Sequence, residues 1–378
     1  MRSLFVCNTP YQLFNVMNLA LNDVQGAGRN SDLFIVARFR DAKKVYDRVM
    51  DEHTFESVYL VEPQRGDTFI KECRDSILIS LEKKIKKYSI GSYDFLEKNY
   101  DQVFIADEMP FGLLMCQFYK SASVWIYEDG YPYYYKNFWQ DLCGGRKQKI
   151  LSLFNRGLST IHPKAFFVNN AEMCQSRVAE KTIQLPKWND QNPAFPAVCR
   201  LFDFNAQSMV SQKKVIFLER PFEEYPKYNG LSPEELLMDL GLTKDSLVRI
   251  HPRSGRRYNE VLVDYGENMW ELECLSNITN DHILIGDCSN AQCSPKVLAN
   301  KEPYLIFAYR LFYDYHDSED PNNYEKQIDQ IRKAYSRKDK IFIPKNIEEL
   351  RNALTWILTK ERDEIIACNA NCTVLESK

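Results

Sequence analysis

The sequence lacks the short motifs that most often reveal a nucleotide or metal site. Neither a Gly-x-Gly-x-x-Gly fingerprint nor a Walker loop occurs in its 378 residues, so the usual signatures of dinucleotide and P-loop sites are absent. No Asp-x-Asp metal motif stands out, and we interpret Asp314–Asn323 as an acidic, solvated loop. The chemistry must therefore be carried by less obvious patterns.

Other absences limit the class of protein. The eleven cysteines are scattered, without Cys-x-x-Cys pairs or zinc spacing, so we expect reduced and mostly buried thiols in a cytoplasmic protein. No apolar run approaches the roughly 18 residues of a membrane-spanning helix. The apolar stretch at Met1–Cys7 is too short for a secretory signal, and we interpret it as a strand. A net charge of -3 argues against a general nucleic-acid binder.

Apolar runs and helical patterns alternate along the chain. A chain of 378 residues predicts two domains by default, and 44% hydrophobic residues are enough for two packed cores. Strands separated by helices predict parallel sheets covered on both faces. Expected strands of the first half are Leu4–Cys7, Leu33–Ala37, Ser57–Val61, Gln102–Ala106, Val124–Tyr127 and Ala165–Val168; expected helices are Pro10–Leu21, Asp41–Asp51 and Thr68–Lys87.

A stretch rich in Pro, Asn and Gln, from Leu185 to Lys214, separates the two halves, and we interpret its later part as a linker. We therefore expect an N-terminal Rossmann-like domain over residues 1–205 and a C-terminal one over residues 206–378. Expected strands of the second half are Val215–Leu218, Leu247–His251, Ile283–Gly286, Tyr304–Phe307 and Ile341–Ile343. A helical pattern covers Ser232–Leu240, and a final helix at about Ile347–Lys360 is a candidate to pack back on the first domain.

The motif His251-Pro252-Arg253 stands at the carboxyl end of an expected strand. Proline biases the preceding residue to an extended conformation, which would hold the imidazole at the strand end. A histidine near its ordinary pKa can stabilise or protonate a leaving phosphate. Arg256 and Arg257 add positive charge close by. The alternative is a histidine that only supports local hydrogen bonds.

The motif Glu128-Asp129-Gly130 follows another expected strand. A carboxylate at a strand end is a candidate general base for a hydroxyl, and glycine permits close backbone approach. The alternative is a simple turn, since Asp-Gly is a strong turn dipeptide. The tyrosine-rich run that begins at Tyr131 fits either a wall for stacking sugars or a core.

Three further segments follow expected strands. Gly286 leads into a loop with Ser289 and Ser294, and Ser294-Pro295 is a natural start of a helix, where anions bind. The segment from Glu219 to Tyr225 offers Glu223 and Glu224 as rival bases, or is merely a charged loop. Candidates on the acceptor side, after the first strand, are Asn8, Thr9, Pro10 and Gln12.

Taken in order, four of these places resemble bacterial sialyltransferases, in particular glycosyltransferase family 52. They are Cys7–Gln12, Glu128-Asp129-Gly130, His251-Pro252 and the serine loop that ends at Ser294-Pro295. The resemblance implies a GT-B fold, in which two Rossmann-like domains with parallel sheets face a central cleft. It also implies metal-independent, inverting transfer of sialic acid from CMP-sialic acid to a galactoside-type glycan of lipooligosaccharide or capsule, with no cofactor.

The same resemblance assigns roles to the candidate residues. Asp129 or Glu128 would be the general base, with Glu223 or Glu224 as rivals, and Tyr131 would lie on the acceptor side. His251 would contact the CMP phosphate, in a donor site shared with the remaining candidates Pro252, Arg253, Gly286, Ser289 and Ser294. Another donor sugar, such as glucose, and a non-catalytic nucleotide- or carbohydrate-binding protein stay open as alternatives. So do a homodimer, and peripheral contact with the inner face of the cytoplasmic membrane through basic residues at Lys83–Lys87.

Overall fold

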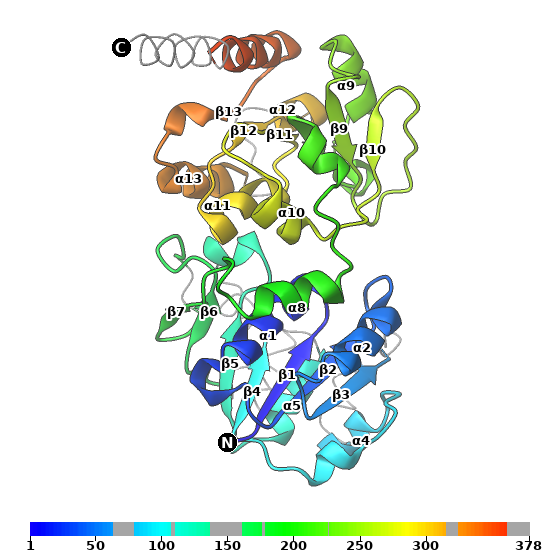
Figure 1. Cartoon of the computed structure of the whole chain (residues 1–378), viewed down its shortest axis with the longest axis vertical. Coiled ribbons are helices and arrows are strands. Elements are labelled where there is room, and N and C mark those ends of the chain that lie inside the picture. Colours follow the sequence, from blue (N-terminus) through cyan, green and yellow to red (C-terminus); the bar gives the residue numbers. More distant parts are fainter. Residues whose placement is uncertain are drawn as a thin grey trace, which may run out of the picture. The chain divides into compact units, whose positions relative to one another are not determined.

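The computed structural model describes residues 1–62, 79–106, 110–136, 161–175, 178–225, 227–314 and 324–360. The chain divides into two compact units (Figure 1). Unit 1 comprises Met1–Ala206 together with Asn268–Ser276 and Ser294–Asn300, and unit 2 comprises Gln207–Glu267, Asn277–Cys293 and Lys301–Lys378. Each unit is built on its own sheet.

Unit 1 holds a seven-stranded sheet in the order β3-β2-β1-β4-β5-β6-β7, and every pairing between these strands is parallel. Its strands are β1 (Ser3–Cys7), β2 (Ser31–Val36), β3 (Ser57–Val61), β4 (Gln102–Ile105), β5 (Ser123–Tyr127), β6 (Phe166–Val168) and β7 (Thr182–Gln184). Its helices are α1 (Pro10–Leu21), α2 (Ala42–Asp51), α4 (Leu81–Ile85), α5 (Pro110–Phe118), α8 (Ala194–Leu201), α10 (Trp270–Ser276) and α11 (Ser294–Ala299).

Unit 2 holds a six-stranded parallel sheet in the order β10-β9-β8-β11-β12-β13. Its strands are β8 (Val215–Leu218), β9 (Ser246–Arg249), β10 (Leu262–Asp264), β11 (Ile283–Gly286), β12 (Tyr304–Phe307) and β13 (Ile341–Phe342). Its helices are α9 (Pro233–Asp239), α12 (Tyr309–Phe312), α13 (Tyr324–Ala334) and a helix over residues 347–360. The prediction of two α/β domains with parallel sheets is confirmed.

The central strands are buried apolar runs, as both sheets require. All residues of β1, β8, β11 and β12 are buried, because a parallel sheet covered on both faces leaves no solvent side. Helix α1 begins where Thr9 accepts a hydrogen bond from the Gln12 N–H at 3.1 Å, with Pro10 as its first residue. The sequence between strand and helix therefore fixes where α1 starts.

The structure corrects the helix expected over Thr68–Lys87. Residues 63–78 lie outside the described part of the chain, but Ile79 and Ser80 are not helical. The side chain of Ser80 accepts the Lys83 N–H at 3.3 Å and so caps a new helix, α4, which starts at Leu81. The loop expected over Asp314–Asn323 also falls outside the description, apart from Asp314.

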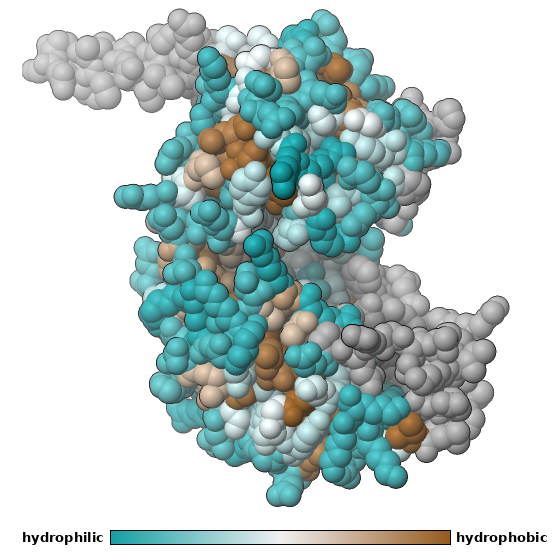
Figure 2. All heavy atoms as spheres, turned by 90° about the vertical axis from the view of Figure 1, so that its right-hand side faces the viewer, coloured by the Kyte–Doolittle hydropathy of each residue, from teal (hydrophilic) through white to brown (hydrophobic). Residues whose placement is uncertain are grey.

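On the face shown in Figure 2, the described hydrophobic residues form small, separate patches among hydrophilic ones. Within the described ranges, no helix combines the length and the apolar character needed to cross a bilayer. The seven described cysteines are free thiols, and five of them are buried.

Candidate functional site

Both sheets place a switch in strand order beside their central strand. If the strands of each sheet are numbered in chain order within that sheet, both sheets share the spatial order 3-2-1-4-5-6, and the sheet of unit 1 has a seventh strand at its end. The direction of winding therefore reverses between β1 and β4 in unit 1 and between β8 and β11 in unit 2. In open parallel sheets, ligands bind outside the carboxyl ends of the strands at this point. The residues that follow β1, β5, β8, β9 and β11 are therefore candidates for a ligand site.

His251 follows β9, on a tight loop that fixes its ring. The backbone N–H of Arg253 donates to Nδ1 of His251 at 3.1 Å, and the Ser254 N–H donates to the His251 carbonyl at 2.8 Å. In a neutral imidazole whose Nδ1 accepts a hydrogen bond, the proton resides on Nε2. The loop thus leaves Nε2–H as a donor for a ligand.

The surroundings keep His251 neutral. Burial lowers its pKa to about 4, helped by the positive charges of Arg253 and Arg220 and opposed by Glu224. At neutral pH the imidazole is therefore a hydrogen-bond donor, not a charged acid. An anionic ligand at Nε2 would offset the two arginines and favour the protonated form.

Glu219 is a buried residue of this site that the sequence analysis did not single out. It directly follows β8 and is only 3% exposed. Its carboxylate accepts the His251 N–H at 3.0 Å, the Ser254 hydroxyl at 2.9 Å and the Tyr258 hydroxyl at 2.7 Å. The available signal was its position as the first polar residue after the apolar run Val215–Leu218, which matches that of Glu128 after β5.

The two rival bases, Glu223 and Glu224, are both paired with arginines. Glu223 contacts Arg256 at 2.6 Å and Glu224 contacts Arg253 at 2.7 Å. Burial raises the pKa of Glu223, but backbone and Arg256 hydrogen bonds outweigh it and lower the pKa overall. A lower pKa makes a carboxylate a weaker base.

A third charged pair lies at the switch point between β8 and β11. Asp287 follows β11, is fully buried, accepts the Tyr313 hydroxyl at 2.6 Å and faces Arg220 at 3.4 Å. Burial raises the pKa of Asp287, although Arg220 and Tyr313 oppose it. Arg220 in turn lies 4.1 Å from the centre of the Tyr225 ring. The pair holds a half-buried positive charge on the same strand-end edge as His251.

The serine loop differs from the expectation. Ser294 is the first residue of α11, but a 3₁₀ turn, η7 (Asn290–Cys293), runs directly into that helix. The N-terminus of α11 is therefore not open to an anion in the way that the sequence led us to expect. The capping role belongs to Ser289, whose Oγ accepts the Ala291 N–H at 3.4 Å. Ser294 is grouped with unit 1, whereas Gly286 and Ser289 belong to unit 2.

Gly286 has a packing role. A Cβ at this position would lie 2.9 Å from Oε1 of Gln292 and 3.1 Å from the Leu218 carbonyl oxygen. The Gln292 side chain is fully buried and bridges the strand ends by donating to the Leu284 and Ile306 carbonyls at 3.2 and 3.0 Å. Glycine therefore lets Gln292 tie β11 to β12.

In unit 1, Glu128 is a buried hub of hydrogen bonds. Its side chain is fully inaccessible and accepts from the hydroxyls of Tyr11 and Tyr134. It also accepts the backbone N–H of Asn169 at 3.0 Å and the Asn169 side-chain amide at 2.7 Å. Burial raises its pKa, and these donors oppose the rise. With both oxygens occupied, Glu128 organises the site and is poorly placed to receive a substrate proton.

Asp129 is the accessible member of the carboxylate pair. It is half-buried, and the Thr9 hydroxyl donates to its Oδ1 at 3.3 Å. The loop after β1 and the loop after β5 therefore meet at this carboxylate. Among the predicted bases of unit 1, Asp129 has the better exposure for contact with a substrate.

The other acceptor-side candidates are mostly structural. Gln12 is fully buried, and its Oε1 accepts the Asn8 backbone N–H at 2.6 Å. Pro10 is the first residue of helix α1. Tyr131 is 4% exposed and stacks against Tyr134, with ring centres 5.7 Å apart. These residues shape the loops beside Asp129 and present little surface of their own.

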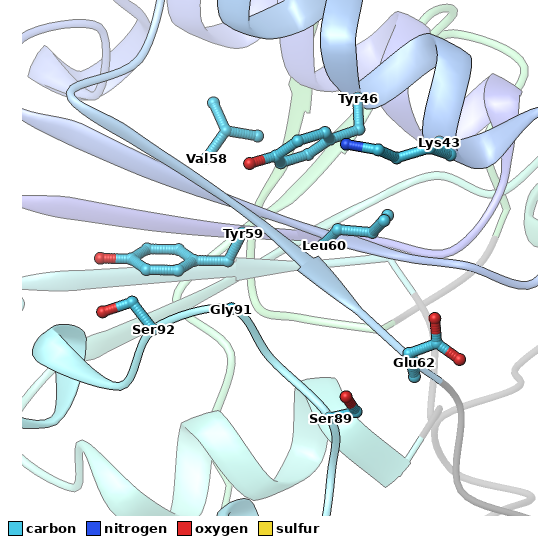
Figure 3. Close-up of a pocket in the computed structure, with 9 residues that line it drawn as sticks. All are labelled: Lys43, Tyr46, Val58, Tyr59, Leu60, Glu62, Ser89, Gly91 and Ser92. Atoms are coloured by element: carbon cyan, nitrogen blue, oxygen red, sulfur yellow. The ribbon is translucent and has the colours of Figure 1, made fainter.

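A cavity of about 370 Å³ lies elsewhere on unit 1, between α2, β3 and the segment 89–92 (Figure 3). None of the predicted site residues lines it. Two of its polar groups already have partners, since Lys43 pairs with Asp47 at 2.7 Å and the Tyr59 hydroxyl donates to Asp94 at 3.0 Å. The cavity gives no support to a catalytic role.

Across the described residues, no group of three or more His, Cys, Asp and Glu side chains is arranged to hold a metal ion. The absence of a metal requirement stays a prediction, which a chelator can test.

Comparison with known proteins identifies the fold. Neither a protein-family model nor a curated protein matches the chain. Among solved structures, the spinosyn forosaminyltransferase SpnP is 10% identical, with a TM-score of 0.52 over 95% of this chain and 91% of that one. The glycosyltransferase of kitacinnamycin is 10% identical, with a TM-score of 0.50 over 94% and 90%. A UDP-N-acetylglucosamine 2-epimerase is 11% identical, with a TM-score of 0.50 over 96% and 89%. The chain thus has the two-unit α/β fold of GT-B glycosyltransferases, as predicted.

Proposed function

We propose that the chain is a glycosyltransferase that uses a sugar nucleotide, and that it transfers sialic acid from CMP-sialic acid to a surface glycan. The observation that carries the proposal is the presentation of Nε2–H of His251 at the carboxyl end of β9, beside Arg220 and Arg253. Such a set of donors and positive charges suits a phosphate that gains negative charge as a bond to it breaks. The resemblance to family 52 adds the choice of CMP-sialic acid.

In the proposed reaction, an acceptor hydroxyl attacks the anomeric carbon of the sugar as the bond from that carbon to the phosphate oxygen breaks. Asp129 receives the hydroxyl proton, and the phosphate leaves as CMP with inverted configuration at the carbon. Nε2–H of His251 donates to the leaving phosphate oxygen, and the arginines balance its charge. No step requires a metal ion.

Asp129 is the preferred base because it is only half-buried, whereas Glu128 is fully buried and both of its oxygens are already occupied. Glu223 and Glu224 remain the rivals, and their arginine partners argue against them. Turnover of Asp129→Asn and Glu223→Gln should be compared side by side. Loss of transfer with retained CMP binding identifies the base.

A sugar-nucleotide 2-epimerase is the second candidate, because an enzyme of that class shares the fold to the same degree. A transferase for a different sugar and a non-catalytic binding protein also stay open, since a fold does not determine its chemistry. An epimerase would convert its sugar nucleotide without any acceptor. A transferase would need one.

The deciding experiment is a thermal-shift titration with CMP, UDP and their sugar conjugates, because a ligand of the native state raises the melting temperature. Stabilisation by CMP supports the proposal and is followed by an acceptor screen with CMP-sialic acid. Stabilisation by UDP alone would reject the sialic acid donor, and incubation with UDP-N-acetylglucosamine alone would then separate an epimerase from a transferase. A cytoplasmic location, contact with the inner membrane face and a homodimer remain predictions.

A further inference from the structure

Glu219 connects two neighbouring strand ends of unit 2. Strands β8 and β9 are adjacent and parallel, with Leu218 opposite Arg249, and the Glu219 N–H donates to the Arg249 carbonyl at 3.0 Å. The Glu219 side chain then reaches over the loop that follows β9. It is the one carboxylate that the described hydrogen bonds place on the backbone of His251.

The donors to Glu219 all come from one loop. Oε2 accepts the His251 N–H, and Oε1 accepts the hydroxyls of Ser254 and Tyr258. These three donors stand at the start, the middle and the end of residues 251–258, so one buried carboxylate gathers the whole loop. Because bonds to an ionised acceptor are stronger than neutral ones, the loop is held firmly.

We propose that Glu219 is a positioning residue for His251: by closing the loop 251–258, its carboxylate holds the imidazole so that Nδ1 accepts the Arg253 N–H and Nε2–H is presented to an anionic ligand. The proposal rests on the proposed function only where that ligand is taken to be a nucleotide phosphate. Glu219 itself need not touch the ligand.

A purely electrostatic role would leave a different signature. The charged groups that act on the imidazole are Arg253 on its own loop, and Arg220 and Glu224 on the loop after β8. If Glu219 acted only through its negative charge, its removal would disfavour the imidazolium and lower the pKa of His251 further. If Glu219 holds the loop, its removal lets water reach the ring, and the pKa rises from about 4 toward the ordinary 6.5.

The test is an NMR titration of the histidine side chains in the full chain. The His251 signal is assigned by its absence from His251→Gln among the five histidines of the sequence. In Glu219→Ala we expect the pKa of His251 to rise by at least one unit, and its nitrogen shifts to report a mixture of tautomers. Glu219→Gln, which keeps the shape and one acceptor, should shift the pKa less. An unchanged or lowered pKa in Glu219→Ala would overturn the proposal.

Glu302 provides the matched control. It is another buried carboxylate of unit 2, and it accepts the Ser336 N–H at 2.8 Å, the Ser336 hydroxyl at 2.6 Å and the Arg337 N–H at 3.2 Å. It precedes β12 and therefore lies at the amino ends of the strands, opposite His251. Glu302→Ala should reduce stability without shifting the His251 titration. An equal shift in both variants would mean general loosening and would refute a specific role.

A double-mutant cycle with CMP as ligand adds a functional readout. Glu219→Ala should weaken CMP binding about tenfold in the wild-type background, as for the loss of one good hydrogen bond. In the His251→Gln background, Glu219→Ala should change CMP binding by less than about twofold, because the imidazole that Glu219 positions is absent. Equal losses in both backgrounds would contradict the proposal. If the wild type does not bind CMP, the proposed function fails, while the NMR titration still decides the role of Glu219.

Discussion

The neighbours Glu128 and Asp129 should separate stability from activity. Glu128→Gln changes one oxygen of the buried carboxylate into an NH₂ group and leaves the shape almost unchanged. Each oxygen of Glu128 accepts one hydroxyl and one N–H of Asn169. A hydroxyl can rotate and become an acceptor, but an N–H cannot.

Either orientation of the new amide therefore sets an NH₂ group against an N–H of Asn169. The Asn169 side chain cannot turn over to relieve this, because its Oδ1 already accepts the Trp188 indole N–H at 3.0 Å. One buried donor loses its acceptor, which costs about 2 kcal/mol of the free energy of unfolding. Asp129→Asn alters a half-buried group and should change that free energy by less than about 0.5 kcal/mol.

Urea unfolding followed by tryptophan fluorescence measures both variants. We expect a lower midpoint for Glu128→Gln with an unchanged slope, and a wild-type midpoint for Asp129→Asn. In the transfer assay, Asp129→Asn should lose about 100-fold or more of its turnover. A Glu128→Gln variant as stable as the wild type would refute the reasoning about the hub. A fully active Asp129→Asn would remove Asp129 as the base.

Three further predictions concern unit 2 and the metal. The pKa of His251 is about 4 in the folded state and near 6.5 in the unfolded state, so the unfolded state binds more protons between these pH values. The free energy of unfolding should therefore fall as the pH drops from about 6.5 to about 4, and it should be retained in full above about pH 6.5. At about 1.4 kcal/mol per pKa unit the upper bound of this loss is about 3 kcal/mol, and urea curves of His251→Gln should lack it. Gly286→Ala should cost about 1–3 kcal/mol in the same assay, because the added Cβ meets Gln292 and the Leu218 carbonyl; a neutral effect would show that the strand ends can relax. Dialysis against EDTA should leave turnover unchanged, and an activity restored only by Mg²⁺ or Mn²⁺ would contradict the metal-free mechanism.

Much of the fold could be predicted because its strands are continuous apolar runs with polar ends. The predicted bounds of β3, β8, β11 and β12 agree with the structure. The last three are fully buried, and a fully buried parallel strand needs such a run. Strand β10 was missed because it has only three residues and just one of them is buried. Helix α8 was missed because it lies in the Pro- and Asn-rich stretch, where its buried residues Ala194, Ala197, Val198 and Leu201 form too short a pattern to stand out.

The positions of the site residues could be predicted from the sequence, but the role of each residue could not. Residues after apolar strands can be picked out locally, as Glu128 and His251 were. Which carboxylate is sealed and which is accessible depends on partners far along the chain, such as Tyr11 and Asn169 for Glu128. Glu219 escaped notice for the same reason, because its three donors lie more than thirty residues away.

The position of β1 in the interior of its sheet affects how the polypeptide can assemble. One neighbour of β1 is β2, but the other is β4, which pairs Ser3 with Gln102 at a separation of 99 residues. Until β4 has left the ribosome, one side of an entirely buried strand has no partner. Such distant pairings slow folding and prolong the time during which an unpaired, aggregation-prone strand edge is exposed during synthesis. Expression at low temperature or together with chaperones should therefore improve the yield of native protein.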